Sequence, residues 1–374
     1  MVQRILVTGA TGFFGRYLVP SLVGKGYRVR AATRRPVSLG EAVEVLPVGD
    51  LTQDIDWHRH ADGMDAVVHL AGLAHVSSET PDTEYDAINC RATARLAKAA
   101  AAAGARLIFM SSVAAQTGPS AAGVLTEDAQ PSPTTAYGRS KLRAEQEIAA
   151  ITNKYVVLRP TLTYGYGVKG NMERIIKLAM LRFAPPFGAI QNQRSLLAIE
   201  NMCEAVSFVL NLDEALKQVF ILSDPEPVSI AEIIYLLRSG AGLSGNSLPV
   251  PPILLATALR LLGRGELWMK LGENLVASVV KLERFGFRWR TDTTVAMRKL
   301  GTLYAKYAKN DSLKLSNTSG LIPHESAAAP NAIPISPHCH SGLNSESSTR
   351  PGSLSNSMPS PGYQAERRCK TVSS

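Results

Sequence analysis

The stretch ILVTGATGFFG, from Ile5 to Gly15, decides the fold of this chain. An apolar run typical of a buried strand leads directly into three glycines, Gly9, Gly12 and Gly15, and a helix-forming run follows. Glycine permits a tight turn and lets another backbone or a ligand approach closely. The free N–H groups at the start of the helix then carry the positive end of its dipole. This arrangement predicts a site for the phosphates of a dinucleotide.

Strand-like and helix-like segments alternate from this turn to about residue 307. The strand-like runs are RILVT, YRVRAAT, VEVLPV, DAVVHL, ARLIFM, KYVVL and QVFIL. Apolar strands that alternate with helices are typical of a parallel sheet covered on both faces. The sequence therefore predicts an α/β protein with a Rossmann-type, doubly wound parallel sheet over residues 1–165, to which segments near 194–225 return. Residues 166–308 are expected to form mainly a smaller C-terminal domain.

Serine, proline and asparagine dominate residues 309–374, where no apolar period is sustained. Such a segment buries too little apolar area to offset its ordering entropy, so we expect a disordered tail. Its HCH sequence, residues 338–340, is interpreted as incidental because a metal site needs more ligands held in place. No metal site is predicted.

The composition argues against a membrane-spanning or secreted protein. The longest apolar run, Pro251 to Leu262, is interrupted by Arg260 and is shorter than the roughly 20 residues that span a bilayer. We interpret this run as a buried helix of the smaller domain, with a partner or membrane-surface contact as the alternative. No basic segment precedes an apolar one near Met1, so no signal peptide is expected.

Cysteine usage and charge narrow the class further. The four cysteines, Cys90, Cys203, Cys339 and Cys369, lie far apart, which argues against a disulfide framework or zinc site and favours a reducing cytoplasm. The net charge of +9 favours anionic ligands. Because no nucleic-acid recognition motif is present, we expect a small phosphorylated ligand and no nucleic acid.

The spacing G-x-x-G-x-x-G in TGATGFFG resembles the extended short-chain dehydrogenase/reductase superfamily, and within it the NAD-dependent epimerase/dehydratase family of nucleotide-sugar enzymes. Further matches follow in the family's order over residues 4–305: GDL, VVHLAG, Asn89, MSSV, YGRSK and LRPTLTYG. The resemblance implies NAD or NADP as cofactor. The residues that it implies for cofactor binding are Gly9, Thr11, Gly12, Phe13, Phe14, Gly15, Arg34, Asp50, Leu51, Leu70, Ala71, Gly72, Asn89, Ser111, Tyr137, Lys141 and Pro160.

The resemblance also implies a catalytic set of Ser112, Tyr137 and Lys141. Tyr137 and Lys141 are four residues apart, hence neighbours on one helix face. A free tyrosine titrates near about 10, and a neighbouring ammonium and an oxidised nicotinamide both favour the phenolate. Tyr137 is therefore predicted to be the general base. Ser112 follows the strand ARLIFM, where it could hydrogen-bond the reacting hydroxyl.

Two features depart from the family pattern. Arg34 and Arg35 follow the second strand, where NAD-preferring members carry an acid, so NADP is at least as plausible as NAD. Val113 stands where many sugar epimerases have a hydroxyl residue, and it cannot donate a hydrogen bond. The reaction subtype therefore stays open.

The segments GVKGNMERII and QRSLLAIENM resemble those that hold the substrate in nucleotide-sugar members, which makes Asn171 and Arg194 the candidate substrate-binding residues. The leading expectation is epimerisation at C4 of a nucleotide sugar, like UDP-glucose 4-epimerase, by transient oxidation. The alternatives are a reductase of a nucleotide 4-keto-6-deoxy sugar and a non-catalytic nucleotide-sensing scaffold. We expect a cytoplasmic protein and possibly a homodimer, as is usual in the family.

Overall fold

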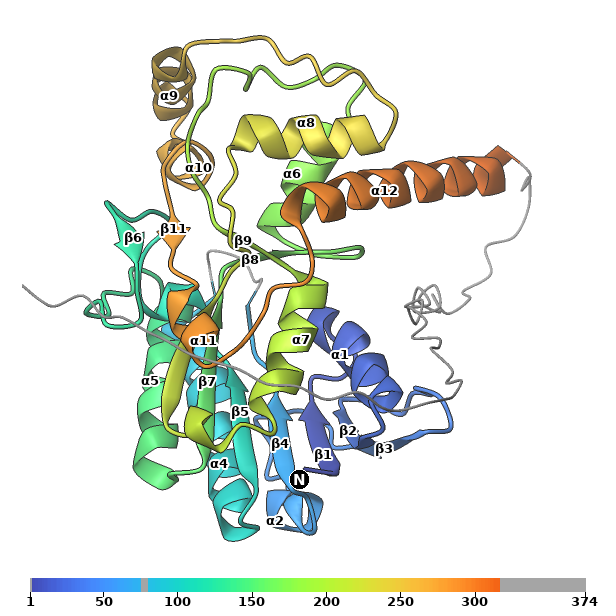
Figure 1. The fold of residues 1–374 in the computed structure, drawn as a ribbon, viewed down its shortest axis with the longest axis vertical. Coiled ribbons are helices and arrows are strands. Elements are labelled where there is room, and N and C mark those ends of the chain that lie inside the picture. Colours follow the sequence, from blue (N-terminus) through green and yellow to red (C-terminus); the bar gives the residue numbers. More distant parts are fainter. Residues whose placement is uncertain (1, 75–79, 317–374) are drawn as a thin grey trace, which may run out of the picture. The chain divides into compact units, whose positions relative to one another are not determined.

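The computed structural model describes residues 2–74 and 80–316, with side chains as far as residue 307 (Figure 1). Its main feature is a seven-stranded sheet in the order β10-β7-β5-β4-β1-β2-β3, in which every neighbouring pair is parallel. The strands are β1 (Arg4–Thr8), β2 (Arg28–Thr33), β3 (Val43–Pro47), β4 (Ala66–His69), β5 (Arg106–Met110), β7 (Tyr155–Pro160) and β10 (Gln218–Leu222). Because all are parallel, their carboxyl ends share one edge of the sheet.

Both faces of the sheet are buried by helices. Ile5 and Val7 of β1 pack on the side of α1 (Phe13–Gly24) and α7 (Ile199–Val209). Leu6, between them, packs on the opposite side with residues of α2 (Trp57–Ala61), α4 (Ala92–Ala102) and α5 (Ala136–Ile151). Successive side chains of a strand point to opposite faces, so an all-apolar strand needs cover on both. The Rossmann-type parallel sheet predicted from the sequence is confirmed.

Shorter elements lie between these layers. They are α3 (Asp82–Tyr85), a π-helical turn η1 (Asp86–Arg91) that continues into α4, the 3₁₀ turns η2 (Val113–Ala115) and η3 (Asp213–Ala215), and α11 (Val280–Arg284). Of these, η2 follows directly on the catalytic-candidate serine at the end of β5.

A second lobe has its own apolar core. It is built from α6 (Asn171–Ala179), α8 (Ile230–Gly240), α9 (Pro252–Leu261), α10 (Gly265–Leu271) and α12 (Thr293–Ser316). Two small parallel sheets accompany it, β8 (Leu162–Tyr164) with β9 (Leu196–Ala198), and β6 (Val124–Leu125) with β11 (Val276–Ala277). Since β6 follows β5 in the chain, its pairing with β11 joins the segment after β5 to the second lobe.

A buried carboxylate, Asp224, links elements of both lobes. It accepts a hydrogen bond from the hydroxyl of Tyr164, the last residue of β8 (2.9 Å). It also accepts from the Asn201 amide of α7 (2.7 Å) and from the Thr293 hydroxyl at the start of α12 (3.2 Å). The backbone N–H of Ala198 also donates to it, at 3.0 Å. All of its donors are neutral.

The apolar run Pro251 to Leu262 does not form the buried helix predicted from the sequence. It forms α9, in which only Ala256 is fully buried, while Ile253, Leu254, Leu261 and Leu262 are 67, 59, 84 and 71% exposed. A run that is apolar on every side cannot bury its whole circumference against one neighbouring layer, and α9 packs with one side only. Among the described residues, no helix is long and apolar enough to cross a bilayer.

The helix α12 continues to Ser316, past residue 309, where the tail was expected to begin. A helix that has already formed extends with little further cost, because each added residue gains one hydrogen bond. The rest of the predicted tail, including HCH at 338–340, Cys339 and Cys369, lies outside the described residues. Cys90 and Cys203 are buried free thiols, and the described residues contain no cluster of three or more metal-ligating side chains.

Candidate active site

The glycine turn predicted to hold phosphates lies between β1 and α1. Gly9 adopts φ +71°, and a Cβ there would meet the Ala71 backbone nitrogen at 2.7 Å. A Cβ on Gly15 would meet the Gly9 and Ala10 carbonyl oxygens at 2.4 Å, so neither position admits a side chain. Gly12 is the N-cap of α1 and has no side chain to cap the helix. The first N–H groups of α1 are therefore open to an anion, which suits a pyrophosphate.

The segment after β4 comes next to this turn and is fixed by Asn89. The Asn89 side chain accepts from the Leu73 N–H (2.7 Å) and donates to the Leu73 carbonyl (2.9 Å) and to the Ser140 hydroxyl of α5 (3.0 Å). A Cβ on Gly72 would lie 2.9 Å from the Asn89 oxygen and 3.2 Å from Lys141 Nζ. Asn89 thus ties Leu73, directly after Gly72, to α5, and its own side chain is buried rather than facing the open edge.

Ser112 and Tyr137 meet at the carboxyl edge of the sheet. Ser112 ends the extension of β5 and caps η2, and Tyr137 lies in the first turn of α5, whose own N-cap is Thr135. The Ser112 hydroxyl hydrogen-bonds the Tyr137 phenol, and this bond lowers the Tyr137 pKa. Burial has the larger, opposite effect and raises the pKa of Tyr137 to about 12. In this structure the phenol therefore stays protonated at neutral pH.

Lys141 is buried one turn further along α5. Its ammonium donates to the Met110 carbonyl at the end of β5 (2.9 Å) and lies 4.6 Å from the centroid of the Phe109 ring. Burial lowers the pKa of Lys141 to about 8, while the charge of Glu145 raises it. The predicted lowering of the Tyr137 pKa by Lys141 is not seen: burial, Ser112 and Tyr85 are the causes that act on the phenol.

His69, which the sequence did not single out, connects the glycine turn with Asn89. Its Nδ1 lies 2.6 Å from the Thr8 hydroxyl, and its Nε2 lies 2.9 Å from the Thr93 hydroxyl. Thr93 donates its proton to the Asn89 carbonyl (2.8 Å), so Nε2 must donate to Thr93 and Nδ1 must accept from Thr8. Burial, and then the charge of Lys141, lower the pKa of His69 to about 3, which keeps this neutral tautomer.

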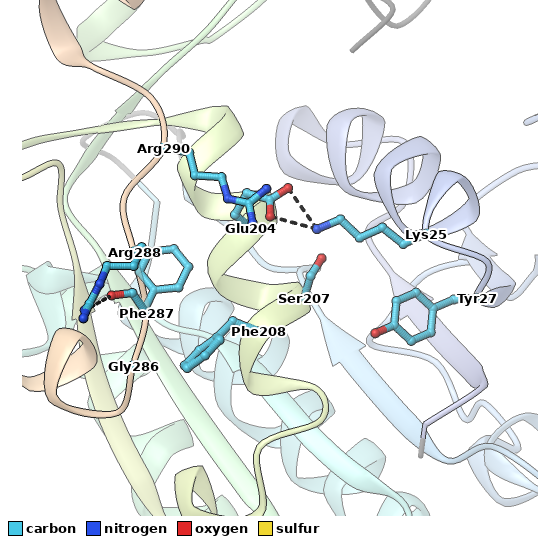
Figure 2. Close-up of a pocket in the computed structure, with 9 residues that line it drawn as sticks. All are labelled: Lys25, Tyr27, Glu204, Ser207, Phe208, Gly286, Phe287, Arg288 and Arg290. Atoms are coloured by element: carbon cyan, nitrogen blue, oxygen red, sulfur yellow. Dashed lines mark hydrogen bonds and ion pairs between the residues drawn. The ribbon is translucent and has the colours of Figure 1, made fainter. Parts of the chain in front are cut away.

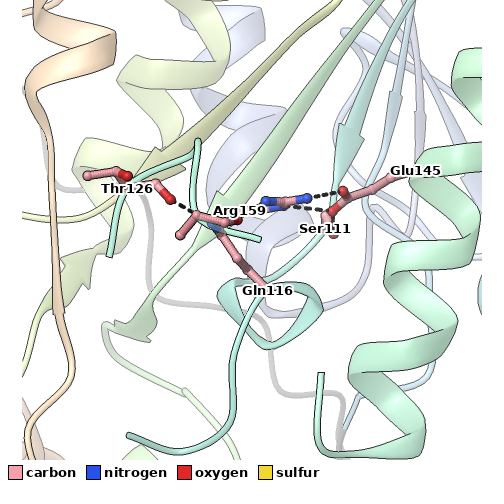
Figure 3. A network of polar contacts seen from close by, with 6 residues as sticks. Ser111, Gln116, Thr126, Glu145 and Arg159 are labelled. Atoms are coloured by element: carbon pink, nitrogen blue, oxygen red, sulfur yellow. Dashed lines mark hydrogen bonds and ion pairs between the residues drawn. The ribbon is translucent and has the colours of Figure 1, made fainter. Parts of the chain in front are cut away.

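Glu145, one turn after Lys141 on α5, belongs to a buried ion pair (Figure 3). Glu145 of α5 accepts from Arg159 of β7 through both carboxylate oxygens, at 3.0 and 2.5 Å. The Ser111 hydroxyl donates to the same carboxylate. Ser111 was predicted to bind the cofactor, but its side chain faces this pair, because successive residues of an extended chain point in opposite directions.

The ion pair extends to the loop that precedes α5. Arg159 donates to the Gln116 side-chain oxygen (2.9 Å), and the Gln116 amide donates to the carbonyls of Thr126 (2.5 Å) and Ala129 (2.9 Å). Figure 3 shows Gln116 and Arg159 aligned between Glu145 and Thr126. This network was missed from the sequence. The four-residue spacing of Lys141 and Glu145 was a possible signal, but the partner on β7 could not be inferred from it.

The remaining cofactor candidates lie along the same edge. Arg34 and Arg35 follow β2 and are exposed, and Arg34 contributes to lowering the pKa of Asp50, whose main cause is the hydrogen bonds from Thr52. The Leu51 carbonyl accepts a hydrogen bond from the Arg95 guanidinium, and the Leu70 backbone N–H donates to the Thr8 carbonyl. The other candidates lie on the glycine turn, on the segment after β4 or at the end of β7; they are Thr11, Phe13, Phe14, Ala71 and Pro160.

The side chains of the two candidate substrate-binding residues differ in exposure and in the hydrogen bonds that they already make. Asn171 is exposed at the first position of α6, after Gly170. The Arg194 guanidinium already donates to the carbonyls of Glu273 (2.9 Å) and Pro119 (3.2 Å). Arg194 therefore joins the loop after η2 to the second lobe, and it would have to share its donors to hold a phosphate.

A pocket of about 380 Å³ lies elsewhere, between the C-terminal end of α1, α7 and residues 286–290 (Figure 2). Lys25, which lines it, follows the end of α1 and pairs with Glu204 of α7 at 2.9 Å. A helix of 12 residues is about 18 Å long. The pocket is thus at the far end of α1 from the glycine turn and is separate from the candidate active site.

Comparison with known proteins agrees with this geometry. A family model described as the NAD dependent epimerase/dehydratase family matches residues 5–222. The UDP-glucose 4-epimerase of Vibrio cholerae is 36% identical over 263 residues, which cover 67% of this chain and 80% of that protein. The ceramide reductase of Caulobacter vibrioides is 34% identical over 167 residues, which cover 44% of this chain and 47% of that protein.

Among solved structures, MoeE5 in complex with UDP-glucose and NAD superposes with a TM-score of 0.66 and 26% identity. The match covers 82% of this chain and 99% of that structure. The open helix N-terminus at the glycine turn and the candidate residues Ser112, Tyr137 and Lys141 all lie within the residues that the family model matches. The chain belongs to the NAD-dependent epimerase/dehydratase family and is an NAD(P)-dependent enzyme of the oxidoreductase type.

Proposed function

We propose that this protein inverts C4 of a nucleotide sugar by transient oxidation at that carbon. The observation that carries the proposal is the contact between Ser112 and Tyr137, with Lys141 buried one turn further along α5, at the edge where the glycine turn opens. The 36% identity to a UDP-glucose 4-epimerase over most of that protein supports the C4 position. The proposal names a nucleotide sugar as the class of substrate and does not name a particular sugar or base.

Gly9, Gly12 and Gly15 would hold the pyrophosphate, and the backbone of Leu70–Gly72 would lie beside the nicotinamide half. When bound in oxidised form, the nicotinamide supplies a reversible hydride acceptor and a positive charge that favours the phenolate of Tyr137. This second effect matters because burial raises the pKa of Tyr137 to about 12, although the Ser112 hydrogen bond lowers it. The glycines that admit no side chain, and the close approach of Gly72 to Asn89 and Lys141, support the view that the residues present suit this cofactor.

The protein's own residues then handle the proton. Tyr137 accepts the proton of the sugar 4-hydroxyl and returns it, while Ser112 holds the same oxygen by a hydrogen bond. Lys141 keeps a positive charge close to the carboxyl end of β5, and Glu145 helps to preserve that charge against burial. Asn171, exposed at the start of α6, is the candidate contact to the sugar nucleotide from the second lobe.

A reductase of a nucleotide 4-keto sugar is the second candidate, and a specific observation favours it. Arg34 and Arg35 are both exposed directly after β2, where they could accept the 2′-phosphate of NADPH. A phenol with a pKa of about 12 is also protonated at neutral pH, as a group that gives a proton to a keto oxygen has to be. In this reaction the same residues act in one direction only.

The two candidates are separated by supplying UDP-glucose without added reductant and, in parallel, a 4-keto-6-deoxy nucleotide sugar with NADPH. Formation of the C4 epimer supports the first, and consumption of NADPH supports the second. Tyr137→Phe should lower either rate by about 10²–10⁴-fold while dinucleotide binding is retained. Tyr235→Phe, which alters an exposed tyrosine on α8, is the matched control and should leave the rate unchanged. Full activity of Tyr137→Phe would overturn both the epimerase and the reductase proposals. The expected homodimer and cytoplasmic location do not depend on this experiment.

A further inference from the structure

The helix α9 exposes apolar side chains to an unusual degree. Ile253, Leu254, Leu261 and Leu262 are 67, 59, 84 and 71% exposed, and we call these four residues the α9 face. Single exposed apolar residues are normal on a protein surface, whereas a contiguous group of them marks an interaction site. These four lie within ten consecutive residues at the two ends of one helix.

Helical spacing places two residues of the α9 face, Leu254 and Leu261, on one side of α9, with Ile253 before them and Leu262 at the C-cap. Leu254 and Leu261 are seven residues apart and therefore point in nearly the same direction. Leu255, Ala256 and Leu259 point the opposite way and contact the core of the second lobe. The small residues Thr257 and Ala258 lie between Leu254 and Leu261 and are exposed as well. The solvent side of α9 thus contains two apolar ends joined by a small, uncharged middle.

The charged residues around the α9 face are mainly basic. Between Leu248 and Leu271 the chain has Arg260, Arg264 and Lys270 against one acid, Glu266. Glu266 lies 3.8 Å from Lys270. Among the described residues, no acidic side chain lies within ion-pair distance of Arg260 or Arg264, and both are exposed. An apolar helix side flanked by unpaired arginines is complementary to a surface of apolar chains beneath anionic head groups.

A second copy of the chain fits this surface less well. A two-fold contact places the same patch of both subunits together. Arg260 and Arg264 would then lie close to the same two arginines of the other copy, and like charges in contact are unfavourable. The one acid of the segment already has a lysine neighbour.

We propose that the α9 face docks this protein on the surface of a membrane that contains anionic lipids. The helix lies in the plane of the interface and does not cross it, since its ten residues are half the length that spans a bilayer. The aliphatic side chains enter the acyl boundary, and Arg260 and Arg264 meet the head-group phosphates. This docking is independent of the reaction proposed above.

The test is co-sedimentation of the full-length protein with vesicles of phosphatidylcholine alone or of phosphatidylcholine mixed with phosphatidylglycerol. We expect binding to the mixed vesicles that weakens as salt is raised. The double variant Leu254→Ser/Leu261→Ser should lose binding by more than about tenfold, because it removes two apolar side chains from the interface. Arg260→Gln/Arg264→Gln should weaken it by about fivefold for each charge.

Val295→Ser is the matched control, because Val295 is an equally exposed apolar residue (65%) on α12. It should bind vesicles like the original protein. All variants retain residues 317–374, so any lipid contact by that segment is common to all. Folding of each variant is checked by circular dichroism and thermal unfolding.

Absence of vesicle binding, or binding that the Leu254→Ser/Leu261→Ser variant retains in full, overturns the proposal. So does sedimentation equilibrium showing a dimer that this same variant dissociates, which would assign the α9 face to a second copy.

Discussion

Glu145 and Asp224 are both buried carboxylates, 7 and 1% exposed, yet their surroundings differ. Glu145 has a cation as partner, Arg159, and lies one turn from Lys141. Asp224 accepts only from neutral donors, which belong to several elements of both lobes. Burial raises the pKa of Asp224 above its ordinary value, although each of its hydrogen bonds lowers it. Glu145 therefore acts through its charge on the neighbouring Lys141, whereas Asp224 acts through hydrogen bonds that join chain segments.

The largest expected effect is on stability, from Arg159→Met. This change leaves Glu145 charged and buried without its cation, which costs about 3–5 kcal/mol in the free energy of unfolding. Urea denaturation measures it. Arg139→Met is a matched control, because both members of its ion pair with Asp82 are exposed, and it should cost about 1 kcal/mol or less. Equal losses for the two variants would contradict the importance of burial.

Removing both members of the Glu145–Arg159 pair tests the same effect of burial. In Glu145→Leu/Arg159→Met both members of the ion pair are removed together, so neither is left buried without the other. We expect the double variant to recover most of the stability that Arg159→Met loses, so in a double-mutant cycle the sum of the two single losses should clearly exceed the loss of the double variant. Simple addition of the single losses would show that the two side chains do not act as a pair.

Asp224→Asn should cost less, about 1–3 kcal/mol at about pH 5, because it weakens hydrogen bonds from neutral donors and leaves no unpaired charge. The folded-state pKa of Asp224 is raised above the unfolded value of 3.8. The folded protein therefore binds the proton more tightly, and stability is lost as pH rises from the unfolded pKa through the folded one. The asparagine variant lacks this loss, so its deficit should shrink with rising pH. A deficit that grows with pH would contradict the raised pKa.

The smallest expected effect concerns the pH profile of turnover. Burial lowers the pKa of Lys141 to about 8, and Glu145 opposes this. If the ammonium is the active form, the alkaline limb of kcat/KM should lie near pH 8 in the original protein and move to lower pH in Glu145→Gln. The loss at that pH should stay below about tenfold. Asp224→Asn is the control and should leave the limb in place; a similar shift in both variants would point to general loosening.

Some of the active-site arrangement could be predicted from particular residues. Gly9, Gly12 and Gly15 follow a strand and begin a helix, so their geometry is local. Tyr137 and Lys141 share a helix face because of their spacing alone. The arrangement that failed prediction involves contacts between elements: the ammonium of Lys141 donates to Met110, and Ser111 faces Glu145. Neither partner is close in the sequence.

The exposure of α9 illustrates the same limit in the second lobe. Its apolar composition indicated burial, but the number of apolar positions that a helix buries depends on how many sides the neighbouring elements cover. Likewise Arg194 has the chemistry of a phosphate-binding side chain, while its donors are occupied by carbonyls from residues 119 and 273.

The sequence by itself determined the parallel sheet, the glycine turn at its carboxyl edge and the order of the candidate catalytic residues. These follow from apolar periodicity, backbone freedom of glycine and helical spacing, all of which act over a few neighbouring residues. The tertiary structure alone decided which charges are paired, how far burial shifts the pKa values of Tyr137 and Lys141, and which apolar helix remains exposed. These properties depend on groups that meet across distant elements, where desolvation and partner geometry outweigh local pattern.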